Sequence, residues 1–258
     1  MLTSALAVNS SFTPADQACR FIDNPNTNPD KDFGSGGVLL IPDNLLSSWP
    51  YLAVSADKNK NIWVMQRSSP GLYNGGSSCT NGTNGNLETV AGTGLYHNTP
   101  AFWQTGTSAG NLYYASFNGP LSQYPVQSTC TSGNPPLCNA TGTTAMDPAG
   151  NSHNFSTGTT PTISSNGTSN GILWALDGMS VEGTNNGVLW AFNAQTMAHL
   201  YNSSQCTGDV IHSATQFSVP TIANGYVYVG AQSNNSTGSP TLGQGTFYVF
   251  GLISGKTC

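Results

Sequence analysis

The chain has 258 residues, of which only 7% are charged, where soluble domains usually carry about a quarter. Hydrophobic residues make up 37% and the mean hydropathy is −0.20, so neutral polar residues fill the gap. The net charge of −5, with six Lys and Arg scattered along the sequence, leaves no basic patch and argues against a nucleic-acid partner. No apolar stretch approaches the roughly 20 residues of a membrane-spanning helix, so no bilayer span is expected.

The composition predicts an all-β fold. Thirty glycines, fifteen prolines and long runs of Ser, Thr and Asn are typical of turns and strands, and helix formers in helical spacing are scarce. Residues 1–35 are expected to be an N-terminal extended segment or linker. Within it, the stretch from Asp23 to Asp32 is interpreted as solvated, with a Ca²⁺-binding loop as the alternative.

A self-similar unit of about 60 residues recurs along the rest of the chain. Pro100, Pro161 and Pro220 mark its last three copies and stand 61 and 59 residues apart. In each copy, apolar and aromatic strands follow one another through turns rich in Gly, Asn and Ser, as in an antiparallel meander. The units are expected over residues 36–90, 91–150, 151–205 and 206–258. The segments that carry their strands are 37–41, 50–55, 62–65, 99–102, 111–115, 160–167, 171–176, 187–192, 219–230 and 245–250, with Asn166 in a turn next to a strand.

The turn from Asp57 to Asn61 in the first unit has the opening alternation of a calcium loop. Its sixth position is Ile62, where a calcium loop needs glycine. Because Asp and Asn are also favoured in tight turns, the sequence predicts a plain hairpin turn here.

Consecutive meanders with aromatic strands predict a β-propeller of four-stranded antiparallel blades, of which about four are visible. Such a blade cannot bury both of its faces without neighbours. A β-sandwich is the alternative, but the strands of a sandwich need not resemble one another at a fixed period. The repeat therefore favours the propeller.

Residues 188–201 resemble the docking motif of the pyrroloquinoline-quinone-type propellers, Ala-x-Asp-x-x-Thr-Gly-x-x-x-Trp. The resemblance implies a turn that staples neighbouring blades, because the aromatic ring of the motif packs on peptide planes of the next blade. The motif positions are matched by Ala191, Asn193 and Thr196, with Met197 in place of its glycine and Tyr201 in place of its tryptophan.

The region from about Gly36 to Lys256 is similar to secreted bacterial proteins of this superfamily, and Ser254-Gly255-Lys256 fits the Thr-Gly-Lys part of the motif. Members of the superfamily usually have seven or eight blades. The resemblance therefore implies a partial propeller: part of a larger ring, a small closed ring, or a half that another copy completes.

The cysteines indicate disulfides and an oxidising compartment. None of the six forms a Cys-x-x-Cys pair or stands at zinc-ligand spacing from a histidine. Cys130 and Cys138 bracket a turn-rich segment and are predicted to be bonded to each other. The sequence leaves the pairing of the other four open: Cys19, Cys79, Cys206 and Cys258.

Eight Asn-x-Ser/Thr sequons add to the expectation of an extracellular or cell-surface protein. Most are placed in turns outside the predicted strands, where a bulky sugar fits, and no sugar is expected on a strand position. Asn234 adjoins Asn235, so at most one of the two is expected to carry sugar. The predicted glycosylation sites are Asn81, Asn139, Asn154, Asn166, Asn202 and Asn235.

The sequence assigns no catalytic, cofactor-binding or metal-binding residue. Catalytic members of the superfamily hold a quinone with Ca²⁺, often against adjacent cysteines, but here no two cysteines adjoin and the acidic residues are isolated. No hydrolase motif such as Gly-x-Ser-x-Gly is present. Trp174 and Trp190 lie in repeat strands and are predicted to be core residues rather than a sugar-binding face.

The leading hypothesis is a secreted, disulfide-bonded, glycosylated β-propeller with a structural or self-assembly role outside the cell, as a homo-oligomer or polymer and without a cofactor. A charge-poor surface lacks the like-charge repulsion that keeps copies apart, so either glycans keep it soluble or it self-associates. The alternative is a carbohydrate- or ligand-binding module. A second alternative is a quinone-dependent alcohol or sugar dehydrogenase, with pyrroloquinoline quinone and calcium.

Overall fold

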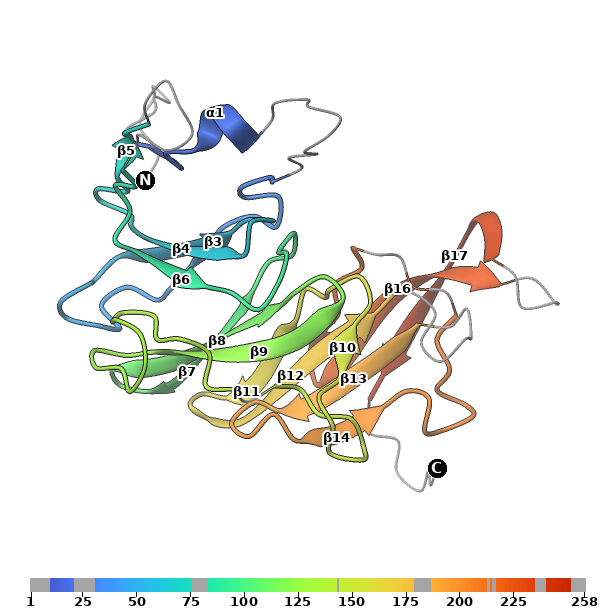
Figure 1. The fold of residues 1–258 in the computed structure, drawn as a ribbon. Helices are drawn as coiled ribbons and strands as arrows, with labels where there is room; N and C mark the ends of the chain where they lie inside the picture. Colours follow the sequence, from blue (N-terminus) through green and yellow to red (C-terminus); the bar gives the residue numbers. More distant parts are fainter. Residues whose placement is uncertain are drawn as a thin grey trace, which may run out of the picture.

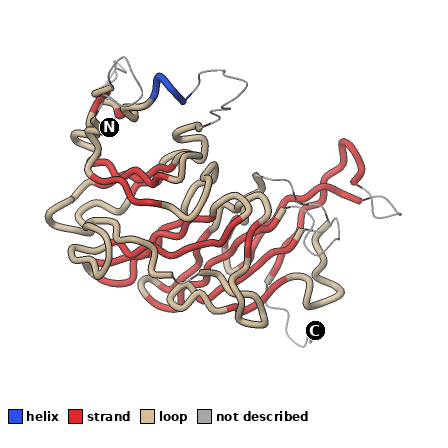
Figure 2. The backbone as a smooth tube through the Cα atoms, viewed as in Figure 1, coloured by secondary structure: helices blue, strands red, loops and turns tan. Residues whose placement is uncertain are grey.

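The structure, a computed structural model, describes residues 10–20, 31–75, 83–142, 144–178, 187–212, 214, 217–234 and 240–251. These residues form strands and turns, with one short helix, α1 (Gln17–Arg20), as Figure 2 shows. None of the described helical segments could reach across a lipid bilayer. The prediction of an all-β fold is confirmed.

Four antiparallel sheets follow one another along the chain and are named sheets I to IV (Figure 1). Neighbouring strands of each sheet are consecutive in the sequence, except that β5 leaves sheet I to pair in parallel with β1. The strands are, in sheet I, β2 (Leu39–Leu40), β3 (Leu52–Ala56), β4 (Asn61–Gln66) and β6 (Glu88–Ala91); in sheet II, β7 (Ala101–Gly106), β8 (Ala109–Ala115), β9 (Gly119–Val126) and β10 (Asn154–Phe155); in sheet III, β11 (Thr162–Asn166), β12 (Ser169–Asp177), β13 (Val188–Asn193) and β14 (His199–Asn202); in sheet IV, β15 (Thr221–Ala223), β16 (Tyr226–Asn234) and β17 (Pro240–Phe250); and in the parallel pair, β1 (Phe12–Thr13) and β5 (Leu72–Tyr73).

The expected meanders are present, with two differences. Sheet II extends past the expected boundary at residue 150, because β10 pairs with β9. Sheet IV has three strands rather than four among the described residues. The first difference arises because β10 has only two residues, too few for a repeat to be recognised in the sequence.

The sheets pack face to face through three separate hydrophobic cores. The first core joins sheets I and II, the second joins sheets II and III, and the third joins sheets III and IV. The first strands of sheets II, III and IV also contact one another in turn, β7 with β11 and β11 with β15. The four sheets therefore form a row in chain order.

Side-chain alternation in the strands places successive residues in different cores. In β8, Leu112 and Tyr114 lie in the first core, whereas Tyr113 and Ala115 lie in the second. In β12, Leu173 belongs to the second core and Leu176 to the third. Because successive side chains of a strand point to opposite faces, each inner sheet is apolar on both sides and is buried by both neighbours.

The turn after β13 ties sheet III to sheet II. The Asn193 side chain accepts the backbone N–H groups of Gln195 (2.9 Å) and Thr196 (3.0 Å), and Met197 adopts the left-handed φ of 60° that glycine takes more easily. The carbonyl of Ala194 in this turn accepts hydrogen bonds from the Tyr113 hydroxyl (2.6 Å) and from the Gln123 amide (3.1 Å). These two bonds are buried links between the sheets.

Tyr201, which was expected to pack on the next blade, has a different contact. Its hydroxyl donates to Asp209 at 2.9 Å. Burial, and to a smaller extent this hydrogen bond, raises the pKa of the Tyr201 phenol. The links that this turn makes to sheet II are the two hydrogen bonds of the Ala194 carbonyl, contacts between side chain and backbone that a sequence motif does not reveal.

The described parts of the N-terminal segment, residues 10–20 and 31–35, pack on sheet I, whereas much of the stretch from Asp23 to Asp32 lies outside the described residues. Phe12 and Phe33 contact the ring of Trp63 in β4 at centroid distances of 5.4 and 6.1 Å. The fully buried Arg20 donates to the fully buried carboxylate of Asp57 at 2.8 Å. The segment therefore covers the part of sheet I around Trp63 on the face that points away from sheet II.

Replacing Asp57 by alanine is expected to destabilise the fold by about 3–5 kcal/mol. Arg20 loses its buried counter-charge and keeps only the partly exposed Asp16, and the indole N–H of Trp63 and the turn N–H groups lose their acceptor. The matched control is Asp43→Ala. Asp43 pairs with Arg67 at the surface, and its loss is expected to cost under about 1 kcal/mol. Urea unfolding followed by tryptophan fluorescence measures both, and equal losses in the two variants would contradict the anchoring role of Asp57.

Candidate functional site

The Asp57 carboxylate closes the hairpin turn between β3 and β4. Its Oδ1 accepts the backbone N–H groups of Asn59 and Asn61 at 2.8 and 2.9 Å. Its Oδ2 accepts Arg20 and, at 2.8 Å, the indole N–H of Trp63. The prediction of a hairpin turn is confirmed. Both carboxylate oxygens of Asp57 already accept hydrogen bonds from protein donors, so neither is left free to bind a cation.

A second buried acid, Asp177, ends β12. Its Oδ1 accepts the hydroxyl of Ser156 at 2.8 Å, and Nε2 of His153 lies 3.4 Å from its Oδ2. The His153 ring packs against Trp190 with centroids 4.2 Å apart. Within the described residues, no group of three or more His, Cys, Asp and Glu side chains is arranged to hold a metal ion.

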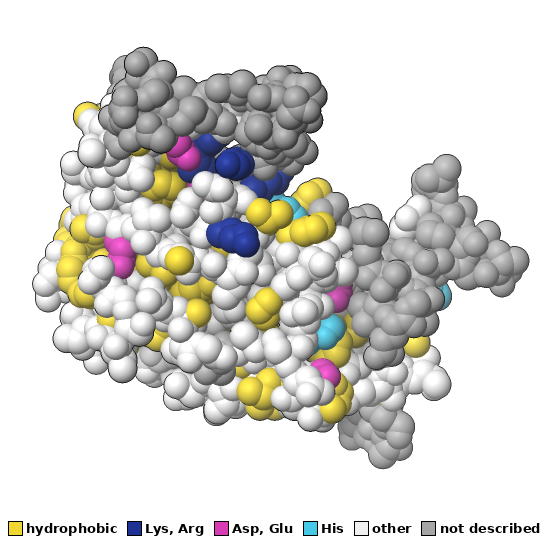
Figure 3. All heavy atoms as spheres, in the orientation of Figure 1, with side chains coloured by type: hydrophobic (Ala, Val, Ile, Leu, Met, Phe, Trp, Pro, Cys, Tyr) yellow, Lys and Arg dark blue, Asp and Glu magenta, His cyan; other side chains and the backbone are white. Residues whose placement is uncertain are grey.

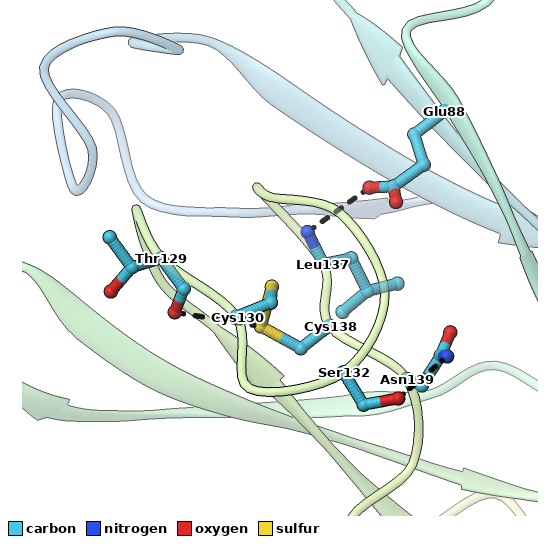
Figure 4. The surroundings of a disulfide bond; sticks show 7 residues. All are labelled: Glu88, Thr129, Cys130, Ser132, Leu137, Cys138 and Asn139. Atoms are coloured by element: carbon cyan, nitrogen blue, oxygen red, sulfur yellow. Dashed lines mark hydrogen bonds between the residues drawn. A yellow bond between two sulfur atoms is a disulfide. The ribbon is translucent and has the colours of Figure 1, made fainter.

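Cys130 and Cys138 form a disulfide, with Cα atoms 5.4 Å apart, as predicted. Cys206 is also disulfide-bonded, and none of the described cysteines is free. The loop closed by Cys130 and Cys138 lies beside sheet I, where the side chain of Glu88 in β6 points toward it (Figure 4). The Glu88 carboxylate accepts the backbone N–H of Leu137 at 3.3 Å.

The predicted glycosylation sites have different surroundings. Asn139 is exposed in the loop after Cys138, and Asn154 and Asn166 are exposed but lie in β10 and β11. Asn202 ends β14 with only 3% of its surface exposed. The placement of Asn154 and Asn202 in turns was wrong, because polar residues here form short outer strands. Asn81 and Asn235 lie outside the described residues, as does the side chain of Asn234.

The tryptophans belong mainly to the interior. Trp190 is buried in the second core and Trp174 packs against the third, so their prediction as core residues is confirmed. Trp63 and Trp103 are also buried. A sugar-binding face built from these indole rings is therefore not present.

The basic residues are less scattered than the sequence indicates. Arg20 donates to the carbonyl of Lys31 and to Asp57, and Lys58, the next residue, pairs with Asp32 at 2.8 Å. On the face shown in Figure 3, Lys and Arg side chains gather beside the N-terminal part, and most of the remaining surface is uncharged. Because acids pair with these bases, the cluster is not a site of strong positive charge.

Among the described residues, an uncovered apolar surface lies on the outer face of sheet IV, the face opposite the third core. It consists of Tyr226, Tyr228, Phe247 and Val249, and Phe247 is 68% exposed. The rings of Tyr228 and Phe247 stack at a centroid distance of 5.7 Å. Singly exposed apolar residues are common on proteins, but a contiguous aromatic sheet face indicates an interaction surface.

A shallow hollow of 640 Å³ adjoins these rings. Gly230, which pairs with Phe247 across the two strands, and Gly245 contribute no side chain to it. A Cβ atom built on Gly230 would meet nothing within 4 Å. The outer face of sheet IV thus has aromatic projections beside a glycine-lined depression, and it is the candidate functional site.

Comparison with protein-family models, with curated proteins and with solved structures finds no match for this chain.

The Glu88 contact predicts a pH dependence of stability. Burial raises the pKa of Glu88 above its ordinary value of 4.5, with the Leu137 hydrogen bond opposing the shift. The folded protein therefore holds this proton to higher pH than the unfolded chain, and the stabilisation present below pH 4.5 is lost as the pH rises through the raised pKa. Relative to Glu88→Gln, the parent chain is expected to lose stability as the pH rises above 4.5; a stability difference that stays constant with pH would refute this.

Burial of Asn202 predicts unequal use of the sequons in a glycosylating host. The Asn202 Nδ2 atom lies 3.2 Å from Nε2 of His199, and its Oδ1 accepts the Ser204 hydroxyl at 2.6 Å, so a sugar would disrupt a packed amide. Glycopeptide mass spectrometry is expected to find sugar on Asn139 and none on Asn202. Full occupancy of Asn202 in folded protein would contradict the burial argument, and Asn139→Gln serves as the control for peptide assignment.

Proposed function

We propose that this chain is a secreted structural β-propeller segment that self-assembles through the outer face of sheet IV. The exposed aromatic face carries the proposal. It has the same alternating apolar composition as the sheet faces that are buried inside the row, and burial of such a surface is favourable by about 25 cal/mol per Å².

Two features support blades of the pyrroloquinoline-quinone type. Sheets I to III are four-stranded meanders, and the first strands of sheets II, III and IV contact one another in turn, as strands around a common axis would. The Asn193–Met197 turn has the side-chain cap, the left-handed residue and the contact with a neighbouring sheet that a docking turn needs. The disulfide between Cys130 and Cys138 supports an extracellular location.

The described residues do not fit a calcium-bound quinone. Both oxygens of Asp57 accept protein donors, and Asp177 is buried against Ser156 and His153. No other described acid, His or Cys joins either carboxylate in a group that could hold a metal ion. We therefore derive no dehydrogenase step for this part of the chain.

Carbohydrate binding is the second candidate, because Tyr226, Tyr228 and Phe247 form a row of neighbouring rings on which sugar faces could stack. If the face binds carbohydrate rather than a second copy, the chain is expected to be a monomer. Isothermal titration with soluble oligosaccharides would then give saturable binding that is lost in Phe247→Ala.

The test of self-assembly uses two valines of equal exposure. Val249, on the outer face of sheet IV, is 54% exposed, and Val38, before β2, is 56% exposed. Light scattering after size exclusion is expected to give a mass above the 26.8 kDa monomer for the parent chain and for Val38→Lys. Val249→Lys is expected to be monomeric, because association would bury its charge. A parent chain that stays monomeric at all concentrations, or equal masses for the two variants, would overturn the proposal.

A further inference from the structure

The two ends of the row of sheets differ. At the sheet IV end, the aromatic outer face is uncovered. At the sheet I end, Ala53, Trp63 and Met65 point away from sheet II and are buried, and Phe12 and Phe33 of the N-terminal segment pack on Trp63. Among the described residues, the sheet IV end presents an aromatic face, whereas the sheet I end is covered around Trp63 and leaves Leu40 and Tyr51 exposed.

This asymmetry restricts how copies can associate through sheet faces. A head-to-tail chain requires the sheet IV face of one copy to meet a free sheet I face of the next. The segment anchored by Arg20 and Asp57 occupies the part of that face around Trp63, which obstructs such a contact. The remaining sheet-to-sheet contact is isologous, with sheet IV of one copy against sheet IV of another.

The outer face of sheet IV is self-complementary. Gly230 in β16 and Phe247 in β17 are direct partners across the hairpin, so a projection and a depression lie side by side at one level of the sheet. A two-fold axis parallel to the strands and midway between β16 and β17 exchanges the two strands. It therefore places Phe247 of each copy over Gly230 of the other.

Charge does not oppose this contact. From residue 213 to residue 255 the chain has no Asp, Glu, Lys, Arg or His. Two identical surfaces with net charge of one sign repel each other, whereas two uncharged faces do not. A second copy thus fits this face without the ionic partner that a charged ligand surface would need.

We infer that the chain forms a closed two-fold dimer in which Phe247 of each copy fills the glycine hollow of the other. The inference rests on the self-assembly proposed above, and it names the outer face of sheet IV in a second copy as the partner surface. It distinguishes a dimer from the open polymer that a head-to-tail contact would build.

The inference is tested with a variant that places a side chain in the hollow. Gly230→Val adds a side chain where nothing lies within 4 Å, at a residue without a positive φ, so the monomer accommodates it. In the dimer the same side chain collides with the partner's Phe247, and the dissociation constant is expected to rise about tenfold or more. Gly106→Val is the matched control, since Gly106 also lies in a strand with open space around its Cβ and is expected to leave dimerisation unchanged.

Sedimentation equilibrium across a concentration series separates the outcomes. A mass that saturates at two copies and falls in Gly230→Val supports the inference. Larger, growing assemblies that Val249→Lys disrupts would overturn the two-fold dimer but leave self-assembly intact. A monomer at every concentration would overturn both. Thermal unfolding of each valine variant checks that a changed mass reflects association and not a loss of folding.

Discussion

The need to cover both faces of every sheet governs how this chain packs. In the inner sheets, neighbouring residues of one strand, such as Tyr113 and Tyr114 in β8, belong to different cores. Ordering a strand costs conformational entropy, which the burial of apolar surface must offset. A sheet with two apolar faces buries enough surface only when a layer lies on each side. The inner sheets cover one another. The outer faces of sheets I and IV have no such neighbour in the row and need a covering layer of another kind.

Sheet I is covered by a layer that depends on specific aromatic and ionic contacts. The N-terminal segment supplies two phenylalanine rings and Arg20, whose guanidinium lies 5.7 Å from the centroid of the Trp63 ring. Removing both charges of the Arg20–Asp57 pair from water costs much of what their attraction returns. The pair therefore adds little net stability, but it fixes where the segment lies, because a displaced segment would leave a buried charge without its partner.

Strand order could be predicted from the sequence because aromatic and β-branched residues recur between Gly- and Asn-rich turns at a nearly constant period. The Cys130–Cys138 bond could be predicted because the two residues are close along the chain and enclose turn formers. The packing of Arg20 on Asp57 could not, since 37 residues separate them and neither position carries a pattern. The outer face of sheet IV could not be recognised either, because Tyr226 and Phe247 alternate with core residues like those of a sheet covered on both sides.

The pairing of charges could not be predicted from the sequence either. Counted along the sequence, the bases are dispersed, but folding brings Arg20, Lys31 and Lys58 together with Asp32 and Asp57, where opposite charges compensate. Another surface base, Arg67, pairs with Asp43. Pairing weakens the local fields around these bases but leaves the net charge of −5 unchanged, so repulsion between copies is smallest where a surface carries no charged residue. Contacts between copies are then decided by apolar area and by shape, and the aromatic outer face of sheet IV, in a stretch without charged residues, is where both are available.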